Sequence, residues 1–297
     1  MKIILNSKKT KETALWLFFV GPIFILFTMF FFVPIISGIV YSFTDWDAIN
    51  SDFNFVGLKN YIFALSIDTD FVASLGRTFY LAFFNVVLTN VLAMLFASAL
   101  VSNFKHNNKI RTAIFLPNVI SMVICGFIWQ VMFTKIIGKF GVATGLGFLD
   151  RSWLGDPDTV LFSILLVSLW YGVGYVMTID IAALQSVNES LIEAASLEGA
   201  NGWQTFWKVK LPVILPTVMV GVFMNVSGSL KMFDLVFSLT GGGPGRASEL
   251  AMLNVYREAY QFNNYGLGSA KAVILSVIII AITIFQFRIT AKNEVEM

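Results

Sequence analysis

Charged residues are scarce in this sequence: they make up 13% of its 297 positions, about half the share usual in soluble domains. Hydrophobic residues make up 57%. A chain of this composition cannot hide its apolar surface from water, and we therefore expect an all-α membrane protein with several transmembrane helices. The formal net charge of +2 indicates little about partners, and no nucleic acid is expected among them.

Cysteine and histidine each occur once, as Cys125 in an apolar run and His106 in a polar loop. A single cysteine cannot form an internal disulfide, and we expect Cys125 to be a small buried hydrophobic side chain. No His/Cys cluster has the spacing of metal ligands, so no metal site is expected.

Motifs for nucleotide binding and catalysis are also missing. Gly241–Ser248 is rich in glycine but lacks the lysine of the G-x-x-x-x-G-K-[ST] pattern. Three charged residues lie within the expected membrane helices at positions that suggest a function: Asp180, Lys231 and Asp234. Lys231 and Asp234 are three positions apart and can pair on one helical face, either at the outer interface or lining a water-filled cavity. We expect a chain that is not an enzyme and binds no cofactor.

Long apolar segments predict six transmembrane helices within one membrane domain over residues 1–297. The first is too long for the apolar region of a signal peptide and lacks a small-residue cleavage site at its end. Basic residues are more numerous in the termini and in the loops 102–112 and 185–213 than in the opposite loops, which predicts that both termini are cytoplasmic. The expected helices cover about 14–43, 76–101, 113–134, 158–183, 214–239 and 267–287.

The loop 185–213 carries its own helix signals. Ser186 with Glu189 fits a capping box, and Gly199 is a natural helix stop. Asn201 can cap a second short helix through Gly202–Lys208, after which prolines open the next apolar run. The loop therefore predicts a helix–turn–helix knob on the cytoplasmic side, which we call the knob.

The knob sequence also holds a spaced pattern of small, acidic, apolar and proline residues: Glu193, Ala194, Ala195, Glu198, Gly199, Ala200, Phe206, Val209, Leu211, Pro212 and Pro216. This pattern resembles the cytoplasmic EAA loop of permease subunits in bacterial ABC importers. Departures are small: Glu198 stands where Asp is commoner, Val209 where Ile is commoner, and Asn188 where Pro often precedes the motif.

A second pattern narrows the resemblance. It comprises Phe55–Tyr61 in the first outer loop, Phe233 and Asp234, the run Leu239, Thr240, Gly241, Gly242, Gly243 and Pro244, then Tyr256–Ala259, Tyr265 and Gly266. Together with the knob these residues cover most of the chain. They are similar to the carbohydrate importers that take oligosaccharides and related solutes, in particular the maltose-F type of permease, which is the first of two homologous membrane subunits.

The resemblance implies the ABC type I importer permease fold, placed in the bacterial cell membrane. It implies a heterodimer with a second permease, two ATP-binding subunits that use ATP and Mg, an extracellular sugar-binding protein and a sugar as substrate. The ATPase-coupling residues would be Glu193, Ala194, Ala195, Glu198, Gly199, Phe206, Leu211 and Pro212. Glu193 would pair with a basic residue of the ATPase. The outer loop with Gly242, Gly243 and Pro244 would approach the binding protein or the pathway, or simply be a turn.

Two polar and aromatic stripes are candidates for the sugar pathway. Ser168, Tyr171 and Tyr175 share one helical face, and Asn225, Ser229 and Met232 repeat that spacing on the next expected helix. Aromatic faces and hydrogen-bonding side chains are what a sugar site needs, and Gly172, Phe233 and Asp234 complete the candidate pathway. The alternative is that these residues belong to interfacial belts or bridge helices.

Three other functions stay open. The same machine could import glycerol-phosphate or another polyol derivative, although a phosphate would favour more cationic groups than Lys231 alone. An ion-coupled secondary carrier would transport without an ATPase, but one charged pair and Asp180 make a poor proton relay. A membrane assembly or receptor component would show no substrate dependence of a partner ATPase.

Overall fold

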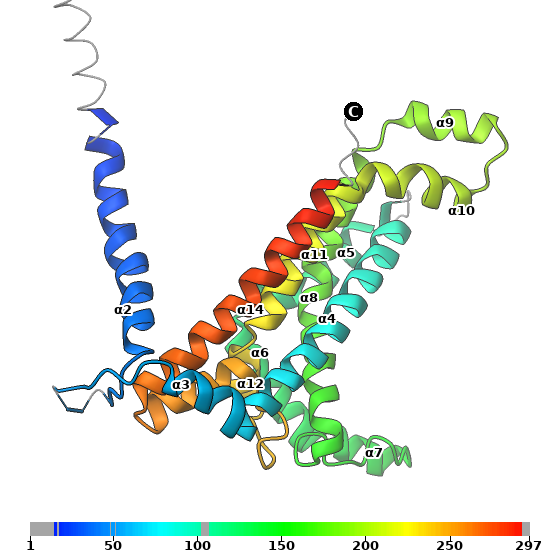
Figure 1. Cartoon of the computed structure of the whole chain (residues 1–297). Helices are drawn as coiled ribbons and strands as arrows, with labels where there is room; N and C mark the ends of the chain where they lie inside the picture. The colour runs from blue at the N-terminus through cyan, green and yellow to red at the C-terminus, as the bar shows by residue number, and fades with distance from the viewer. Residues whose placement is uncertain (1–14, 17, 48, 51, 102–106, 293–297) are drawn as a thin grey trace, which may run out of the picture. The chain divides into compact units, whose positions relative to one another are not determined.

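The structure is a computed structural model, and it describes residues 15–16, 18–47, 49–50, 52–101 and 107–292 (Figure 1). Within these residues the regular elements are helices, and the β-type pairing is one isolated bridge between Thr44 and Phe55. In chain order the elements are η1 (Thr28–Phe32), α2 (Val33–Tyr41), α3 (Lys59–Ile62), η2 (Phe63–Ile67), α4 (Thr69–Val101), α5 (Asn107–Phe115), η3 (Leu116–Val119), α6 (Met122–Val131), η4 (Met132–Ile137), α7 (Gly138–Thr144), α8 (Pro157–Gln185), α9 (Glu189–Leu197), α10 (Gly202–Thr205), η5 (Phe206–Lys210), α11 (Leu211–Leu230), α12 (Asp234–Leu239), α13 (Ala251–Tyr256), η6 (Arg257–Gln261) and α14 (Tyr265–Lys292).

Six continuous helices of the described chain are long and apolar enough to cross a membrane. This confirms the expected all-α architecture with six spans. Their bounds are Phe18–Tyr41, Thr69–Val101, Met122–Thr144, Pro157–Gln185, Gly202–Leu230 and Tyr265–Arg288.

Several of the expected boundaries are wrong: the second span begins at Thr69, the third ends at Thr144 and the fifth begins at Gly202. Two further errors have a local cause. The third span begins at Met122 and not at 113, because the chain makes a 3-10 turn at Leu116–Val119 with Pro117 in it. A proline has no backbone N–H to donate and disfavours helical geometry in the residue before it. The fifth span ends at Leu230, and a break at Lys231–Phe233 separates it from α12.

The chain divides into two compact units, residues 1–67 with 255–274 and residues 68–254 with 275–297. The helix α14 belongs to both units, and the expectation of a single membrane domain stays a prediction. The knob and the pathway candidates all lie in the second unit.

Polar contacts organise the first unit after the end of α2. Asn60 donates from Nδ2 to the carbonyl oxygens of Ser42 (3.0 Å) and Thr44 (2.8 Å). The backbone and side-chain N–H groups of Asn54 donate to the carboxylate of Asp45, which lowers the pKa of that exposed carboxyl. The loop that resembles the first outer loop of carbohydrate permeases is therefore folded back onto the end of α2.

An ion pair is buried in the first unit. Lys271 on α14 donates from Nζ to Oε2 of Glu258 on η6 at 2.7 Å, and the Lys271 side chain has no solvent exposure. Asn264 donates from Nδ2 to the other carboxylate oxygen of Glu258, also at 2.7 Å. The pair thus ties η6 to the first turns of α14.

Helices α4, α8 and α11 form the core of the second unit, and they run side by side in Figure 1. Small residues on α4, such as Ala93 and Ala97, let α8 approach closely. Val176, Met177 and Ile181 on α8 are buried in this contact.

Gly174 on α8 is a point of close approach. A Cβ at this position would lie 2.2 Å from the carbonyl oxygen of Ile114, whereas one at Gly172 would lie 3.8 Å from Cγ2 of Thr89. We expect Gly174→Ala to destabilise the protein by about 1–3 kcal/mol, because α5 must move away from α8. Gly172→Ala is the matched control, since both variants gain the same helix propensity. Unfolding of the purified chain in detergent measures the difference, and equal stabilities would contradict the prediction.

Candidate functional site

The knob begins at Asn188. Its Oδ1 accepts hydrogen bonds from the backbone N–H (3.0 Å) and the Oγ (2.9 Å) of Ser190, which starts α9. The expected capping box of Ser186 and Glu189 is wrong, because Ser186 is the C-cap of the preceding helix and its hydroxyl donates to the carbonyl of Ala183. Only two residues therefore connect the end of α8 to the knob.

The turn of the knob is at Gly199, as predicted. Its φ of +83° is a left-handed conformation that favours glycine. Its N–H donates to the carbonyl of Ser196 at 3.0 Å, and the N–H of Ala200 donates to that of Ala195 at 3.0 Å. These bonds satisfy carbonyl groups at the end of α9 and close the helix.

The second part of the knob starts at Asn201. Its side chain accepts from the N–H of Gln204 and its own N–H donates to the Gln204 side chain, both at 2.9 Å. The predicted cap is confirmed, and it is a capping box. The expectation of a separate short helix is wrong, because α10 continues through the π-helical turn η5 into α11 as one helix, Gly202–Leu230. Pro212 lies in the first turn of α11, where no break results.

The predicted coupling residues divide into two groups by exposure. Ala195 is buried, and Phe206 and Leu211 pack against the core cluster, so these three hold the knob together. The others have exposed side chains or backbone: Glu193, Ala194, Glu198, Gly199 and Pro212.

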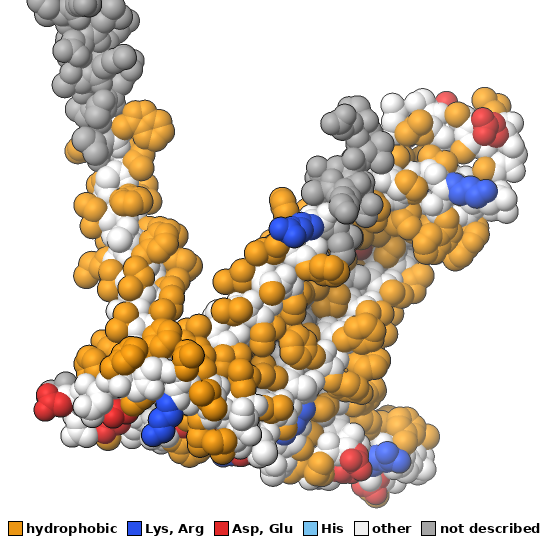
Figure 2. All heavy atoms as spheres, in the orientation of Figure 1, with side chains coloured by type: hydrophobic (Ala, Val, Ile, Leu, Met, Phe, Trp, Pro, Cys, Tyr) orange, Lys and Arg blue, Asp and Glu red, His pale blue; other side chains and the backbone are white. Residues whose placement is uncertain are grey.

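The knob also exposes apolar side chains that the spacing argument missed. Leu197 is 90% exposed and Trp203 71% exposed, and Figure 2 shows hydrophobic side chains gathered on this part of the molecule. Leu197 lies on α9, outside the membrane spans, and apolar exposure there indicates a protein contact. The signal in the sequence was the presence of large apolar residues, Leu197 and Trp203 among them, in a loop between two membrane spans.

A cavity of about 280 Å³ lies among α4, α8, α11 and α12. All nine predicted pathway residues line it: Ser168, Tyr171, Gly172, Tyr175, Asn225, Ser229, Met232, Phe233 and Asp234. The two stripes predicted from helical spacing on neighbouring segments thus line the same cavity.

Asn85 on α4 was missed, and it joins the two stripes. Its Nδ2 donates to Oγ of Ser229 on α11 at 2.8 Å, and its Oδ1 accepts from Oγ of Ser168 on α8 at 2.8 Å. Ser229 donates in turn to Oδ1 of Asn225 at 3.2 Å. All three helices therefore meet in one hydrogen-bond network.

This network changes the roles of the two serines. Ser168 and Ser229 are buried and fully engaged between helices, so they tie the helices together and leave the accessible wall to larger side chains. Tyr171 and Asn225 are half-buried, and the hydroxyl of Tyr175 donates to Sδ of Met224 at 3.2 Å. Aromatic rings and an amide thus face the cavity.

Lys231 and Asp234 are both exposed and both line the cavity. They do not share a helical face, because Lys231 is the C-cap that follows α11 and Asp234 begins α12. The expected pairing at three-residue spacing is therefore wrong, and the interpretation that places both charges at a cavity is the one that matches the structure. The interruption of the helix between α11 and α12 thus brings one cationic and one anionic side chain to this cavity.

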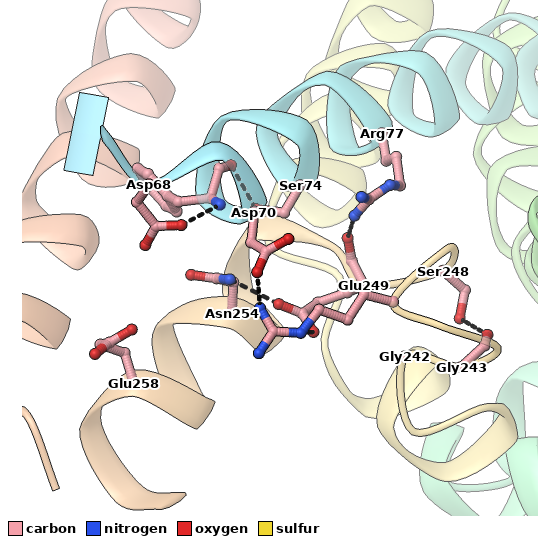
Figure 3. Close-up of polar contacts among 12 residues, drawn as sticks. Asp68, Asp70, Ser74, Arg77, Gly242, Gly243, Ser248, Glu249, Asn254 and Glu258 are labelled. Atoms are coloured by element: carbon pink, nitrogen blue, oxygen red, sulfur yellow. Dashed lines mark hydrogen bonds and ion pairs between the residues drawn. The ribbon is translucent and has the colours of Figure 1, made fainter. Parts of the chain in front are cut away.

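The glycine-rich outer loop is a closed turn fastened to α4 (Figure 3). Gly241 and Gly242 have φ values of +57° and +86°, and Oγ of Ser248 donates to the carbonyl of Gly243 at 2.5 Å. Gly242 is buried, while Gly243 and Pro244 are half-buried. The expected bend is confirmed, and its approach to a partner stays a prediction.

Two arginines hold this loop against the start of α4. Arg77 donates from Nη1 to the carbonyl oxygen of Glu249 at 2.8 Å, and Arg246 forms an ion pair with Asp70. Glu249 accepts from the side chain of Asn254 at 2.6 Å (Figure 3). The loop is thus anchored to the outer end of α4 through Arg77 and Arg246.

Residues 89–294 match the family described as binding-protein-dependent transport system inner membrane component. The chain is 38% identical to the probable starch degradation products transport system permease protein AmyD of Thermoanaerobacterium thermosulfurigenes, covering 98% of this chain and 100% of the relative. It is 35% identical to the multiple sugar-binding transport system permease protein MsmF of Streptococcus mutans, covering 94% and 96%. The sn-glycerol-3-phosphate transport system permease protein UgpA of Agrobacterium fabrum is 31% identical, with coverage of 92% and 94%.

The fold is similar to that of a chain in the crystal structure of a bacterial ABC transporter involved in the import of the acidic polysaccharide alginate. The TM-score is 0.83 at 21% identity, covering 97% of this chain and 98% of the other. A second structure of that transporter, in complex with an alginate pentasaccharide-bound periplasmic protein, gives a TM-score of 0.81 at 21% identity, covering 94% of each chain. These likenesses confirm the expected importer permease fold.

Proposed function

Since this chain belongs to the family of binding-protein-dependent transport system inner membrane components, we propose that it is the permease subunit of an ATP-driven importer of oligosaccharides. The carbohydrate cargo is supported by the names of the relatives AmyD and MsmF. The observation that carries the proposal is the polar and aromatic cavity, whose two main helices lead directly into the knob.

The proposed partners are supported by the family, which is named for transport with a binding protein, and by the similar transporter structure that holds a periplasmic protein. A second homologous permease completes the membrane part as a heterodimer, two ATP-binding subunits dock on the knob, and an extracellular sugar-binding protein delivers the sugar. ATP and Mg are used in the ATP-binding subunits, and this chain binds no cofactor and catalyses no reaction. Nucleotide drives transport only if it binds one access state more tightly than the other.

Force would reach the cavity along two helices. The second part of the knob and α11 form one continuous helix, Gly202–Leu230, so a push on α10 would be carried through η5 and past Pro216 to Asn225 and Ser229. The first part is joined to α8 through Ser186–Asn188. The helices that carry the two stripes are both connected to the knob. When the two ATP-binding subunits close on each other, the distance between the cavity walls would therefore change.

The cavity wall suits a sugar. The rings of Tyr171, Tyr175 and Phe233 offer flat apolar faces for the C–H faces of pyranose rings, and Asn225 and Asn118 offer amide donors and acceptors. Glucose-type units present these two kinds of surface side by side. The cavity therefore supports a neutral or weakly charged oligosaccharide as cargo.

Tyr171→Ala tests the sugar site. We expect the apparent KM for uptake to rise about two- to tenfold, since an aromatic contact contributes about 0.5–1.5 kcal/mol. Uptake of radiolabelled maltotriose and a panel of other oligosaccharides, measured in proteoliposomes with the complete transporter, gives the kinetics. Phe162→Ala is the control, because Phe162 is an exposed aromatic residue of the same helix outside the cavity. Wild-type kinetics for every sugar in the Tyr171 variant would contradict the proposed site.

Glycerol-phosphate or another polyol phosphate is the second candidate cargo. The relative UgpA and the cation of Lys231 in the cavity favour it. Lys231→Gln then lowers uptake of glycerol 3-phosphate and spares maltotriose, whereas an oligosaccharide importer shows no glycerol 3-phosphate uptake to lose. The ion-coupled carrier is disfavoured, because the family is named for transport with a binding protein.

A further inference from the structure

A second hollow lies in the second unit, on the cytoplasmic half of α4. It is a groove of about 570 Å³ between α4 and the helix Gly202–Leu230, with Leu184 of α8 at its floor. It shares no residue with the pathway cavity. The proposed sugar pathway does not use it, although Phe206 and Leu211 in its wall are predicted coupling residues.

The groove has the length of one leaflet. Its α4 wall extends from Asn90 to Val101, the last residue of that helix, which is roughly 16 Å at 1.5 Å per residue. Half of the hydrocarbon core of a bilayer is about 15 Å thick. Since α4 ends on the cytoplasmic side, the groove spans the inner leaflet from its middle to its surface.

The walls of the groove are mainly apolar. Val91, Met94 and Leu95 face it from α4, and Phe206, Leu211 and Val218 face it from the other helix. Leu95 remains 61% exposed. A hydrocarbon chain would cover these side chains, as lipid covers the outside of any membrane helix.

The cytoplasmic mouth has the chemistry of a headgroup region. Trp203 and Trp207 pack edge to face at a centroid distance of 5.5 Å, and Lys210 lies beside them. Tryptophan is enriched at the membrane interface, and lysine near the cytoplasmic surface attracts anionic lipids. Among the described residues that line the groove, none is acidic.

We propose that the groove binds an anionic phospholipid of the inner leaflet, with an acyl chain along α4 and the phosphate at Lys210. The apolar walls match an acyl chain, and Lys210 beside the two indoles at the mouth matches an anionic headgroup. A helix of a partner subunit in the groove is the alternative that the crosslinking experiment below detects.

Lipid titration tests the headgroup. The full chain, purified in detergent with the subunits that accompany it, is titrated with dioleoyl phosphatidylglycerol and with dioleoyl phosphatidylcholine, and bound lipid is counted by native mass spectrometry. We expect saturable binding with a preference of about fivefold for phosphatidylglycerol, the contribution of one lysine near the surface. Lys210→Gln removes the preference and keeps phosphatidylcholine binding. Lys109→Gln is the control, an exposed cytoplasmic lysine outside the groove. A preference that survives Lys210→Gln overturns the headgroup assignment.

A filling variant tests the chain position. Leu95→Trp occupies the groove and abolishes saturable binding of both lipids, while Ile124→Trp, at an exposed position on α6 outside the groove, leaves it unchanged. Equal lipid binding in the two variants overturns the proposal. A photo-crosslinker at position 95 in intact membranes gives a phospholipid adduct of this chain. An adduct with another protein instead identifies the groove as a subunit contact and also overturns the proposal.

Discussion

The double variant Glu193→Ala/Gly199→Val is expected to abolish ATP-driven uptake while the membrane helices stay folded. Gly199 has a φ of +83°, which a β-branched residue adopts only with strain, so the angle between α9 and α10 must change. Glu193 is exposed on α9 and free to pair with a basic residue of the ATPase. Breaking a charge pair buried at an interface costs about 2–5 kcal/mol, which is more than tenfold in docking affinity.

Two measurements separate uncoupling from unfolding. Co-purification of the ATP-binding subunits with this chain reports docking, and sugar uptake in proteoliposomes reports coupling. Glu189→Ala and Gly202→Val are matched controls, because Glu189 is another exposed acid of α9 and a Cβ at Gly202 would meet no atom within 4 Å. Normal docking and uptake in the double variant would show that the knob is not the receiver of force.

Lys271→Met is expected to destabilise the protein by about 3–5 kcal/mol, because it leaves the buried carboxylate of Glu258 without its cation. The Lys271 side chain is fully buried, and its Nζ lies 2.7 Å from the Glu258 carboxylate. Adding Glu258→Gln should recover much of the loss, since a neutral amide can still bond to Asn264. The two residues are then coupled, as a double-mutant cycle measures.

Unfolding of the purified chain in detergent, followed as a function of temperature, gives the four stabilities of this cycle. Lys59→Met is the control for loss of a lysine, because Lys59 is exposed in the same unit. If Lys271→Met unfolds like Lys59→Met, the pair does not hold η6 against α14. If the double variant is as unstable as the sum of the single ones, the two side chains are not coupled.

Local patterns in the chain were enough to locate the two halves of the candidate site. Gly199 and Asn201 close and open helices through hydrogen bonds to residues at most five positions away, and both were predicted correctly. The spacing of Ser168, Tyr171 and Tyr175 placed one stripe on a single face of α8. Helix caps and helical spacing depend on residues a few positions apart, and they can therefore be recognised in a single sequence.

A predicted helix boundary was wrong where apolar residues continue through a point at which the backbone leaves the helical conformation. The stretch 214–239 reads as one hydrophobic segment, yet the chain leaves the helix at Lys231–Phe233 and resumes it in α12. After this interruption, α12 packs against α6, where Gly126 has no side chain and lets Ser238 approach. Contacts of that kind join residues more than 100 positions apart and leave no local trace.

The sequence by itself determined the membrane class of this protein, its six spans, the helical knob and the residue types of the pathway, because composition, periodicity and caps act over a few turns of chain. Only the tertiary structure decided that Asn85 ties both stripes together, that α10 continues into α11, and that Trp203 and Lys210 close a groove with α4. Each of these depends on which helices lie next to each other. That choice is made by the packing of whole surfaces, in which no single segment specifies its neighbour.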